Sequence, residues 1–260
     1  MAVERSLGLK ILLGVSLLLI GGIFFVPPIA QPASYHHFSD ARAMAGVPNA
    51  LNVLSNAGFL FVGIAGLWFL FRRQLFITTE ERLPYIVLFC GVLLTTFGSS
   101  YYHWSPSDKT LFWDRMPMTF GFMGFFGGCV GERISPRAGR LFLSPLVVIG
   151  VASVFYWQWS GDLRPYVLVQ FYPLLAIPLM MALFKPRYTR GGDILFALAL
   201  YVAAKFCESY DGAIYGRLRF VSGHSIKHLL AALASFVLLR MLYLRQPSEQ
   251  PARLAASGRL

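Results

Sequence analysis

Apolar runs of about twenty residues, separated by short polar segments, are the feature that most restricts how this chain can fold. A helix needs about 20 residues to cross the hydrocarbon core of a bilayer. Runs of this length occur at approximately 9–29, 48–71, 84–103, 110–131, 140–159, 164–184, 192–210 and 222–244. Only 13% of the residues are charged, against roughly 25% in soluble domains. The sequence therefore predicts an all-α, polytopic membrane helix bundle with eight spans.

The first apolar run, Ile11–Val26, follows Arg5 and Lys10, which is the outline of a signal peptide or a signal anchor. A cleavage motif of small residues does not follow it, so we favour an uncleaved span over a cleaved signal peptide. We divide the chain into an N-terminal transmembrane helix or signal anchor at 1–30, a membrane domain at 31–245 and a polar tail at 246–260.

Lysine and arginine residues are unequally distributed between the two predicted sides of the membrane. One side carries Arg5, Lys10, Arg72, Arg73, Arg82, Arg133, Arg137, Arg140, Lys185, Arg187, Arg190, Arg240, Arg245, Arg253 and Arg259. The other side carries Arg42, Lys109, Arg164, Arg217 and Arg219. The positive-inside rule places the richer side, with both termini and the tail, in the cytoplasm. Because the positive charges stand in small groups between spans, they explain the net charge of +11 without a nucleic-acid partner.

His224 and His228 form an HxxxH pair in the last apolar run. Residues four apart lie on the same face of a helix, so both imidazoles can reach one metal ion. The pair alone leaves two interpretations open, because two histidines hydrogen-bonded to neighbouring helices would look the same.

A second polar group falls in the string from Phe97 to Pro117. Ser99 precedes His103 by one helical turn, and Asp114 follows across a short turn at the start of the next span. A hairpin of two helices would therefore present the three side chains near one level. Each also has a structural interpretation, with Ser99 bonded to its own backbone and Asp114 as a charge favoured at a helix start.

Together these motifs resemble the ceramidase domain of the alkaline ceramidases, in a superfamily that includes the adiponectin receptors. The family pattern is a Ser-x3-His, then an Asp on the next helix, then an HxxxH in the last helix, and Asn52–Asn56 (NVLSN) resembles the first core helix. The resemblance covers roughly 40–245. It implies a seven-helix ceramidase-like core, with the N-terminal span as an addition. It also implies one zinc ion per chain, held by His103, His224 and His228.

One feature of the family is missing. The eukaryotic ceramidases bind calcium through acidic residues before and inside the first core helix, whereas this chain offers only Asp40, with Asn49 where a Glu is expected. This departure argues against calcium dependence. The neighbouring segment 36–42 (HHFSDAR) is expected to serve a different purpose at the rim of the site.

Three histidine ligands leave one position of a zinc ion open, as in catalytic sites that activate water. Asp114 is then the expected general base, or else a group that orients a histidine ligand. Ser99 is expected to donate a hydrogen bond to the oxyanion or to hold the water, and the sequence does not separate these two roles.

A metal site inside a helix bundle suits a substrate that is already dissolved in the bilayer. The resemblance implies hydrolysis of ceramide or a similar N-acyl lipid to a fatty acid and a free amine. The acyl chain is expected among the fourth to sixth spans. Two alternatives remain, a hydrolase of another lipid amide or ester, and a zinc-containing lipid receptor or sensor of the adiponectin-receptor type. The site is expected to face the periplasm of a bacterial inner membrane or the lumen of a eukaryotic endomembrane, and protein partners are not indicated.

The remaining ionisable residues within the spans, Arg115, Lys205, Glu208 and Lys227, are expected to make bonds between helices. Glu208 and Asp211 fall at the outer end of their span, close to His224 in the predicted layout, where they could pair with Arg217 or Arg219. Phe122, Phe125 and Phe126 are expected to pack or to contact lipid.

Overall fold

The computed structural model describes residues 2–248, which fold entirely into helices and their connections. The long helices are α1 (Ala2–Gly22), α3 (Ala57–Arg72), α4 (Arg82–Trp104), α5 (Asp108–Arg133), α6 (Pro136–Ser160), α7 (Arg164–Leu183), α8 (Gly191–Ser209) and α10 (Gly223–Leu244). Shorter elements are α2 (Ala50–Leu54), α9 (Asp211–Leu218) and the 3₁₀ turns Ile23–Phe25, Ala33–His36 and Thr79–Glu81. The all-α prediction is confirmed.

Six helical segments are long and apolar enough to cross a membrane: Glu4–Phe25, Ala50–Arg72, Thr79–Trp104, Pro136–Ser160, Arg164–Leu183 and Gly223–Leu244. The chain is thus a multi-pass membrane protein. The two other predicted spans are the long helices α5 and α8, which fall outside this group. Both carry several ionisable residues, among them Asp114 and Arg115 on α5 and Lys205 and Glu208 on α8. The prediction of eight spans is therefore met in part.

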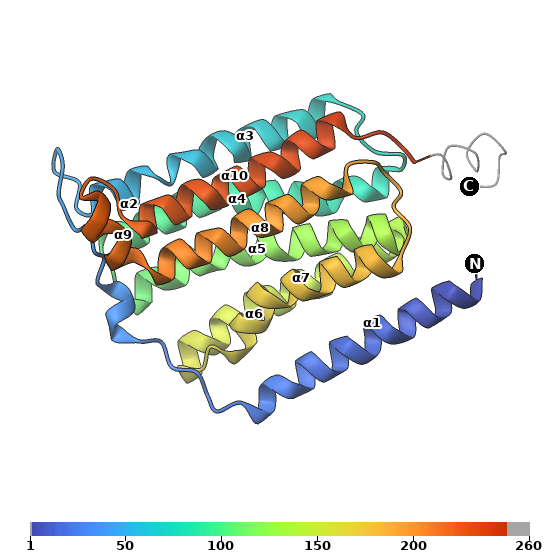
Figure 1. The fold of residues 1–260 in the computed structure, drawn as a ribbon, viewed down its shortest axis with the longest axis horizontal. Helices are drawn as coiled ribbons and strands as arrows, with labels where there is room; N and C mark the ends of the chain where they lie inside the picture. Colours follow the sequence, from blue (N-terminus) through green and yellow to red (C-terminus); the bar gives the residue numbers. More distant parts are fainter. Residues whose placement is uncertain (1, 249–260) are drawn as a thin grey trace.

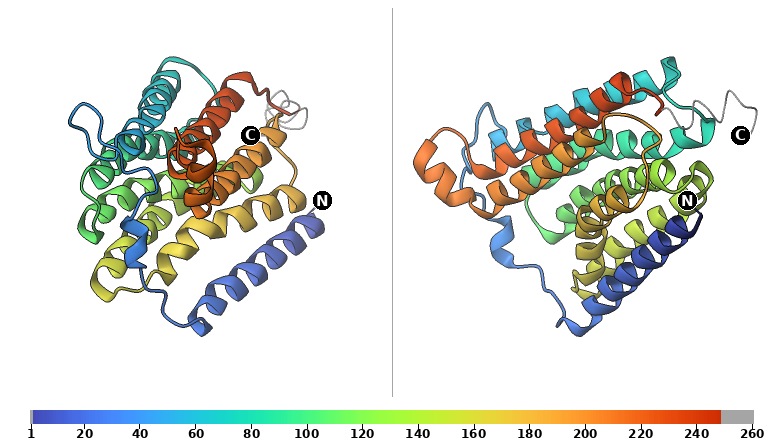
Figure 2. Two further views of the ribbon diagram at one scale, coloured as in Figure 1. Left: turned by 60° about the vertical axis from the view of Figure 1, so that its left-hand side comes forward. Right: turned by 45° about the vertical axis from the view of Figure 1, so that its right-hand side comes forward.

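The long helices from α3 to α10 run side by side as a bundle, and α1 lies along its edge against α7 (Figures 1 and 2). Ser16 of α1 shares a 2.6 Å hydrogen bond with the hydroxyl of Tyr172. The start of α1 and the end of α10 lie at the same end of the bundle (Figure 1). The end of α4 and the start of α10 lie at the opposite end, next to α2 and α9.

Helices α4 and α5 are joined by a three-residue turn and touch backbone to backbone. A Cβ atom added at Gly98 would come within 2.0 Å of the carbonyl oxygen of Trp113. Only glycine permits this approach, in the way that small residues permit close helix packing in membranes. The contact sets Ser99, the next residue on α4, beside Asp114, the next residue on α5.

A similar contact joins α8 to α10. A Cβ atom at Gly223 would lie 2.1 Å from the carbonyl oxygen of Cys207. The first turn of α10 is therefore pressed against the last turns of α8, and this brings Lys227 within reach of Glu208.

A network of buried charges closes the end of the bundle where α4 begins and α10 ends. Glu132 accepts hydrogen bonds from Arg245 and from the hydroxyl of Tyr85. Glu81 accepts from Arg187 at 3.0 Å and from the hydroxyl of Tyr188 at 2.7 Å. Each carboxylate is thus neutralised by one arginine and also bonded by one tyrosine, as a buried charge requires.

Candidate metal centre

The three histidines of the sequence motifs meet inside the bundle. His103 comes from the last turn of α4, and His224 and His228 come from the first two turns of α10. They are 0%, 4% and 2% exposed. One ring nitrogen from each lies within 4.8 Å of the other two. The prediction that these residues converge is confirmed, and the cluster is positioned to hold a metal ion.

One pair of ring nitrogens has the spacing of two ligands on a tetrahedral ion. Nε2 of His103 lies 3.2 Å from Nε2 of His228. Two nitrogen ligands about 2.0–2.1 Å from a tetrahedral zinc ion would lie about 3.3 Å apart. The other ring nitrogen of His228, Nδ1, lies 2.8 Å from Oγ of Ser55. A bond of this kind orients the ring and leaves Nε2 free for the ion.

In the described part of the chain, the rings of His103 and His224 lack a serine partner of the kind that orients His228. Nδ1 of His103 is buried and has no hydrogen-bond partner among residues 2–248, although Asn49 donates to the backbone carbonyl of His103 at 2.9 Å. Nε2 of His224 lies 3.1 Å from Nζ of Lys227. A metal ion bound through this nitrogen would take the place of the bond.

The segment between α1 and α2 covers the cluster from the end of the bundle. The ring of Phe38 packs against those of His103 and His224, with centroids 4.7 and 4.9 Å away. Asp211 fixes this segment to α10, because its carboxylate accepts from the backbone N–H groups of Ser39 at 2.9 Å and His224 at 2.7 Å. The segment therefore forms the rim that the sequence suggested.

A salt bridge strengthens the same segment. Arg42 donates two hydrogen bonds of 2.8 Å to Asp40 and one to the carbonyl of Phe220. The guanidinium group lowers the pKa of the Asp40 carboxyl from its usual range. Asn52 donates to the Asp40 carbonyl at 3.3 Å. Asp40, the only acidic residue retained from the calcium pattern, is thus occupied by Arg42.

Ser99 and Asp114 lie together beside the histidines. Both residues are buried, and the carboxyl group of Asp114 interacts with the side chain of Ser99. Both line one cavity together with His228. The structure thus places the two predicted catalytic residues next to the cluster.

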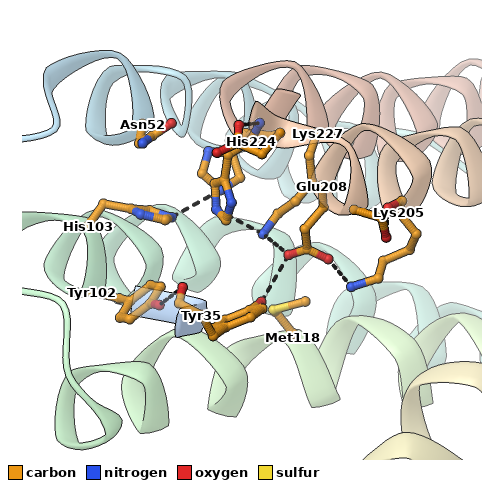
Figure 3. A network of polar contacts seen from close by, with 12 residues as sticks. Tyr35, Asn52, Tyr102, His103, Met118, Lys205, Glu208, His224 and Lys227 are labelled. Atoms are coloured by element: carbon orange, nitrogen blue, oxygen red, sulfur yellow. Dashed lines mark hydrogen bonds and ion pairs between the residues drawn. The ribbon is translucent and has the colours of Figure 1, made fainter. Parts of the chain in front are cut away.

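Glu208 anchors a group of buried charges that contacts His224. It accepts hydrogen bonds from Lys227 at 2.7 Å, from Lys205 and from the hydroxyl of Tyr35 at 2.9 Å (Figure 3). The expected pairing with Arg217 or Arg219 is wrong, because those residues belong to the short helix α9 and the turn after it. The glycine contact between α8 and α10 directs Glu208 to Lys227 instead.

Two neighbouring cavities lie inside the bundle beside the cluster. The polar one is lined by Ser99, Asp114, Arg115, Lys205, Glu208, Lys227 and His228, among others. The apolar one includes Leu88, Val92, Phe122, Phe125, Leu174 and Leu198 in its wall. Both cavities share Phe59, Thr95, Met118, Gln170, Tyr201 and Ala231. The charged groups and an apolar cavity are thus next to each other.

Some residues that line this space were not recognised in the sequence. Phe122 and Phe125 face the apolar cavity, in addition to packing, and α8 and α10 contribute to its wall where α6 was expected. Arg115 lines the polar cavity and was expected only to bond to another helix. Its position directly after Asp114, within an apolar run, was the signal available, because ionisable residues within spans mark functional sites.

Comparison of the chain with protein-family models and with curated proteins finds no match. The likeness to the ceramidase domain accordingly rests on the sequence motifs themselves.

Proposed function

We propose that this protein is a zinc-dependent membrane amidase that hydrolyses ceramide or a similar N-acyl lipid. The observation that carries the proposal is the meeting of three groups in one place. These are the buried three-histidine cluster, the Ser99–Asp114 pair and a polar cavity that adjoins an apolar one. Each group alone is compatible with several roles, whereas together they supply a metal site, a proton carrier and space for a lipid chain, as hydrolysis of a lipid amide by a metal enzyme needs.

The donor set supports zinc as the metal. Imidazole ligands suit zinc among the common metals, and a site with three protein ligands keeps a position open. When bound, zinc lowers the pKa of coordinated water to about 7 and polarises the carbonyl group of a substrate. His103, His224 and His228 would hold it, with Ser55 orienting His228.

Asp114 supplies the proton transfers that hydrolysis needs. A water molecule adds through its oxygen to the carbonyl carbon, and Asp114 takes the proton that the water loses. The carbon–nitrogen bond then breaks, and Asp114 passes the proton to the departing amine. The products are a fatty acid and a free amine, so atoms and charge balance.

Ser99 supports this cycle from one turn before His103. Its side chain interacts with the Asp114 carboxyl group and would orient that carboxylate. The same hydroxyl lines the cavity, from which it can donate a hydrogen bond to the developing oxyanion.

The apolar cavity provides for the acyl chain. Its wall includes side chains such as Leu88, Val92 and Leu198, which offer no hydrogen bonds, and it adjoins the cavity of the charged groups along the shared lining. A lipid with one long chain and a polar amide fits this division, since the chain is buried in hydrocarbon while the amide reaches the cluster.

Metal analysis and product release together test the proposal. Purified protein should contain about one zinc ion per chain and should release fatty acid from at least one member of a panel of N-acyl lipids. A chelator should remove both the metal and the activity, and added zinc should restore them. One zinc ion per chain with no release from any amide or ester lipid would instead favour the receptor alternative. Release that persists after complete removal of metal would contradict the proposal.

A further inference from the structure

Arg115 is a buried cation in the wall of the polar cavity whose charge is not balanced by a partner. It is 6% exposed. Its Nη2 donates to the side-chain oxygen of Gln31, and its Nη1 has no hydrogen-bond partner in residues 2–248. None of the ion pairs in this part of the chain involves Arg115.

Aromatic rings hold the guanidinium group in place. Its central carbon lies 4.2 Å from the ring centroid of Trp157, 4.9 Å from that of Tyr166 and 5.8 Å from that of Tyr35. Such contacts place a cation over aromatic faces but supply neither a hydrogen-bond acceptor nor a negative charge. The rings therefore position the group but do not neutralise it.

The polar cavity as a whole also carries more positive than negative charge. Its ionisable lining contains three cations, Arg115, Lys205 and Lys227, and two carboxylates, Asp114 and Glu208. Glu208 is bonded by both lysines, and Arg115 and Asp114 carry opposite charges without forming an ion pair in residues 2–248. The lining as a whole therefore carries an excess of one positive charge, and a bound zinc ion would add to it.

We propose that Arg115 binds the carboxylate of the substrate, so that the preferred lipids are N-acyl amino acids. This inference rests on the proposed function and deepens it by naming the amine side of the substrate. Arginine is the residue that best binds planar carboxylates, because its N–H groups form a rigid fork. A monoanion brings the single negative charge that the cavity lacks, whereas the amino alcohol head of ceramide brings none.

The order of residues along α5 fits such a molecule. In an N-acyl amino acid, one carbon atom separates the amide nitrogen from the carboxylate. Asp114 and Arg115 are consecutive residues that line the same cavity. An amide placed at Asp114 therefore carries its carboxylate toward Arg115, and its acyl chain extends into the apolar cavity.

Binding to metal-depleted protein tests this inference separately from catalysis. The probes are N-palmitoylglycine and N-palmitoylethanolamine, which differ mainly in a carboxylate against a hydroxymethyl group, and N-palmitoyl phosphatidylethanolamine, whose monoanion is a phosphodiester. Binding in detergent with a chelator present can be followed through tryptophan fluorescence, because Trp157 contacts Arg115. We expect the glycine conjugate to bind about 10–100-fold more tightly than the ethanolamide, the range given by one charge-assisted hydrogen bond.

Three variants complete the test. Arg115→Gln should reduce the preference for the glycine conjugate to less than about twofold, and Arg115→Lys should keep part of it, because the charge remains and the fork is lost. Arg240→Gln, on the exposed side of α10, should leave the preference unchanged. Thermal melting of each variant shows that it is folded, and an Arg115→Gln protein that does not fold leaves Arg115→Lys to decide.

The possible outcomes separate the two proposals. Equal affinity for the glycine conjugate and the ethanolamide in the wild type would overturn this inference, even if ceramide is hydrolysed. Tighter binding of the phosphodiester than of the carboxylate would overturn it as well. A preference for the carboxylate that disappears in Arg115→Gln would support it, even if no lipid is cleaved and the proposed function fails.

Discussion

The two ends of the helix bundle both bury ionisable side chains, but they satisfy them in different ways. Where α4 begins and α10 ends, Glu81 and Glu132 are each bonded by an arginine and a tyrosine. Where α4 ends and α10 begins, three histidine nitrogens face one another, and Arg115 forms no ion pair within residues 2–248. At the first end each carboxylate has its cation within the protein, although Arg187 Nη2 and Arg245 Nε have no hydrogen-bond partner in the same residues. At the second end the three histidines could hold a metal ion.

The largest expected effect concerns the histidines. His228→Ala should reduce zinc to well below one ion per chain and abolish amidase activity, since two ligands hold the ion poorly. Metal analysis of the purified variant, with fatty-acid release, measures both. A variant that keeps one zinc ion per chain would show that the cluster is not the metal site. His37→Ala, in the loop beside Phe38, serves as the matched control, because His37 is not one of the three clustered histidines.

Asp114→Asn should separate metal binding from catalysis. Asparagine has nearly the same shape as aspartate but cannot accept a proton, so we expect zinc to be retained and turnover to fall about 10²–10⁴-fold. Turnover is measured at saturating lipid beside the zinc content. Unchanged turnover would limit Asp114 to orienting the site.

At the end of the bundle that buries Glu81 and Glu132, we expect a substitution to lower stability and to leave metal binding unchanged. Arg245→Met leaves the carboxylate of Glu132 buried without its cation, which should cost about 3–5 kcal/mol of unfolding free energy. Denaturation in detergent measures this loss. Adding Glu132→Gln to Arg245→Met should recover part of it, because the unpaired charge is gone. Loss of zinc in folded Arg245→Met protein would contradict the division between the two ends.

A smaller effect on metal affinity is expected at Ser55, which contacts His228 and is not itself one of the three histidines. Ser55→Ala removes the partner of Nδ1 of His228, and such partners typically contribute 10–100-fold in metal affinity. Competition with a zinc chelator of known affinity measures the change. An affinity within twofold of wild type would mean that the ring is held by its packing alone, and Ser235→Ala on α10 controls for loss of a helix serine.

The last prediction concerns the orientation of the protein in the membrane. It involves no change in activity. In a background without Cys90, Cys129 and Cys207, Lys109→Cys and Lys185→Cys place single thiols at exposed positions of opposite ends. A membrane-impermeant maleimide added to intact cells should label position 109 and spare position 185, as the distribution of lysine and arginine predicts. The opposite labelling pattern would reverse the predicted orientation of the histidine end.

Much of the helical layout could be predicted, because an apolar run of about twenty residues has few alternatives in a membrane. The convergence of His103, His224 and His228 followed from motif spacing and from the resemblance. The partner of Glu208 and the exposure of Arg115 to the cavity could not be predicted in this way. They depend on helix approach distances set by Gly98 and Gly223, and hydropathy carries no information on these distances.

The break between α2 and α3 at Ser55 and Asn56 was also not predicted, since the run 48–71 reads as one span. It matters for the site, because Ser55 lies at this break and reaches His228.

The position of the polar cavity beside the histidine rings has a consequence for kinetics. Under the proposed function, a lipid that reaches the cluster through the polar cavity lined by His228 would come from within the bilayer rather than from bulk water. Its encounter rate would then depend on how much of the surrounding surface consists of substrate molecules. Inert detergent or phospholipid, added at a constant total amount of substrate, would slow the reaction by surface dilution. For such an enzyme, the rate would follow the mole fraction of substrate in the membrane or micelle. It would not follow the molar concentration of substrate in the bulk solution.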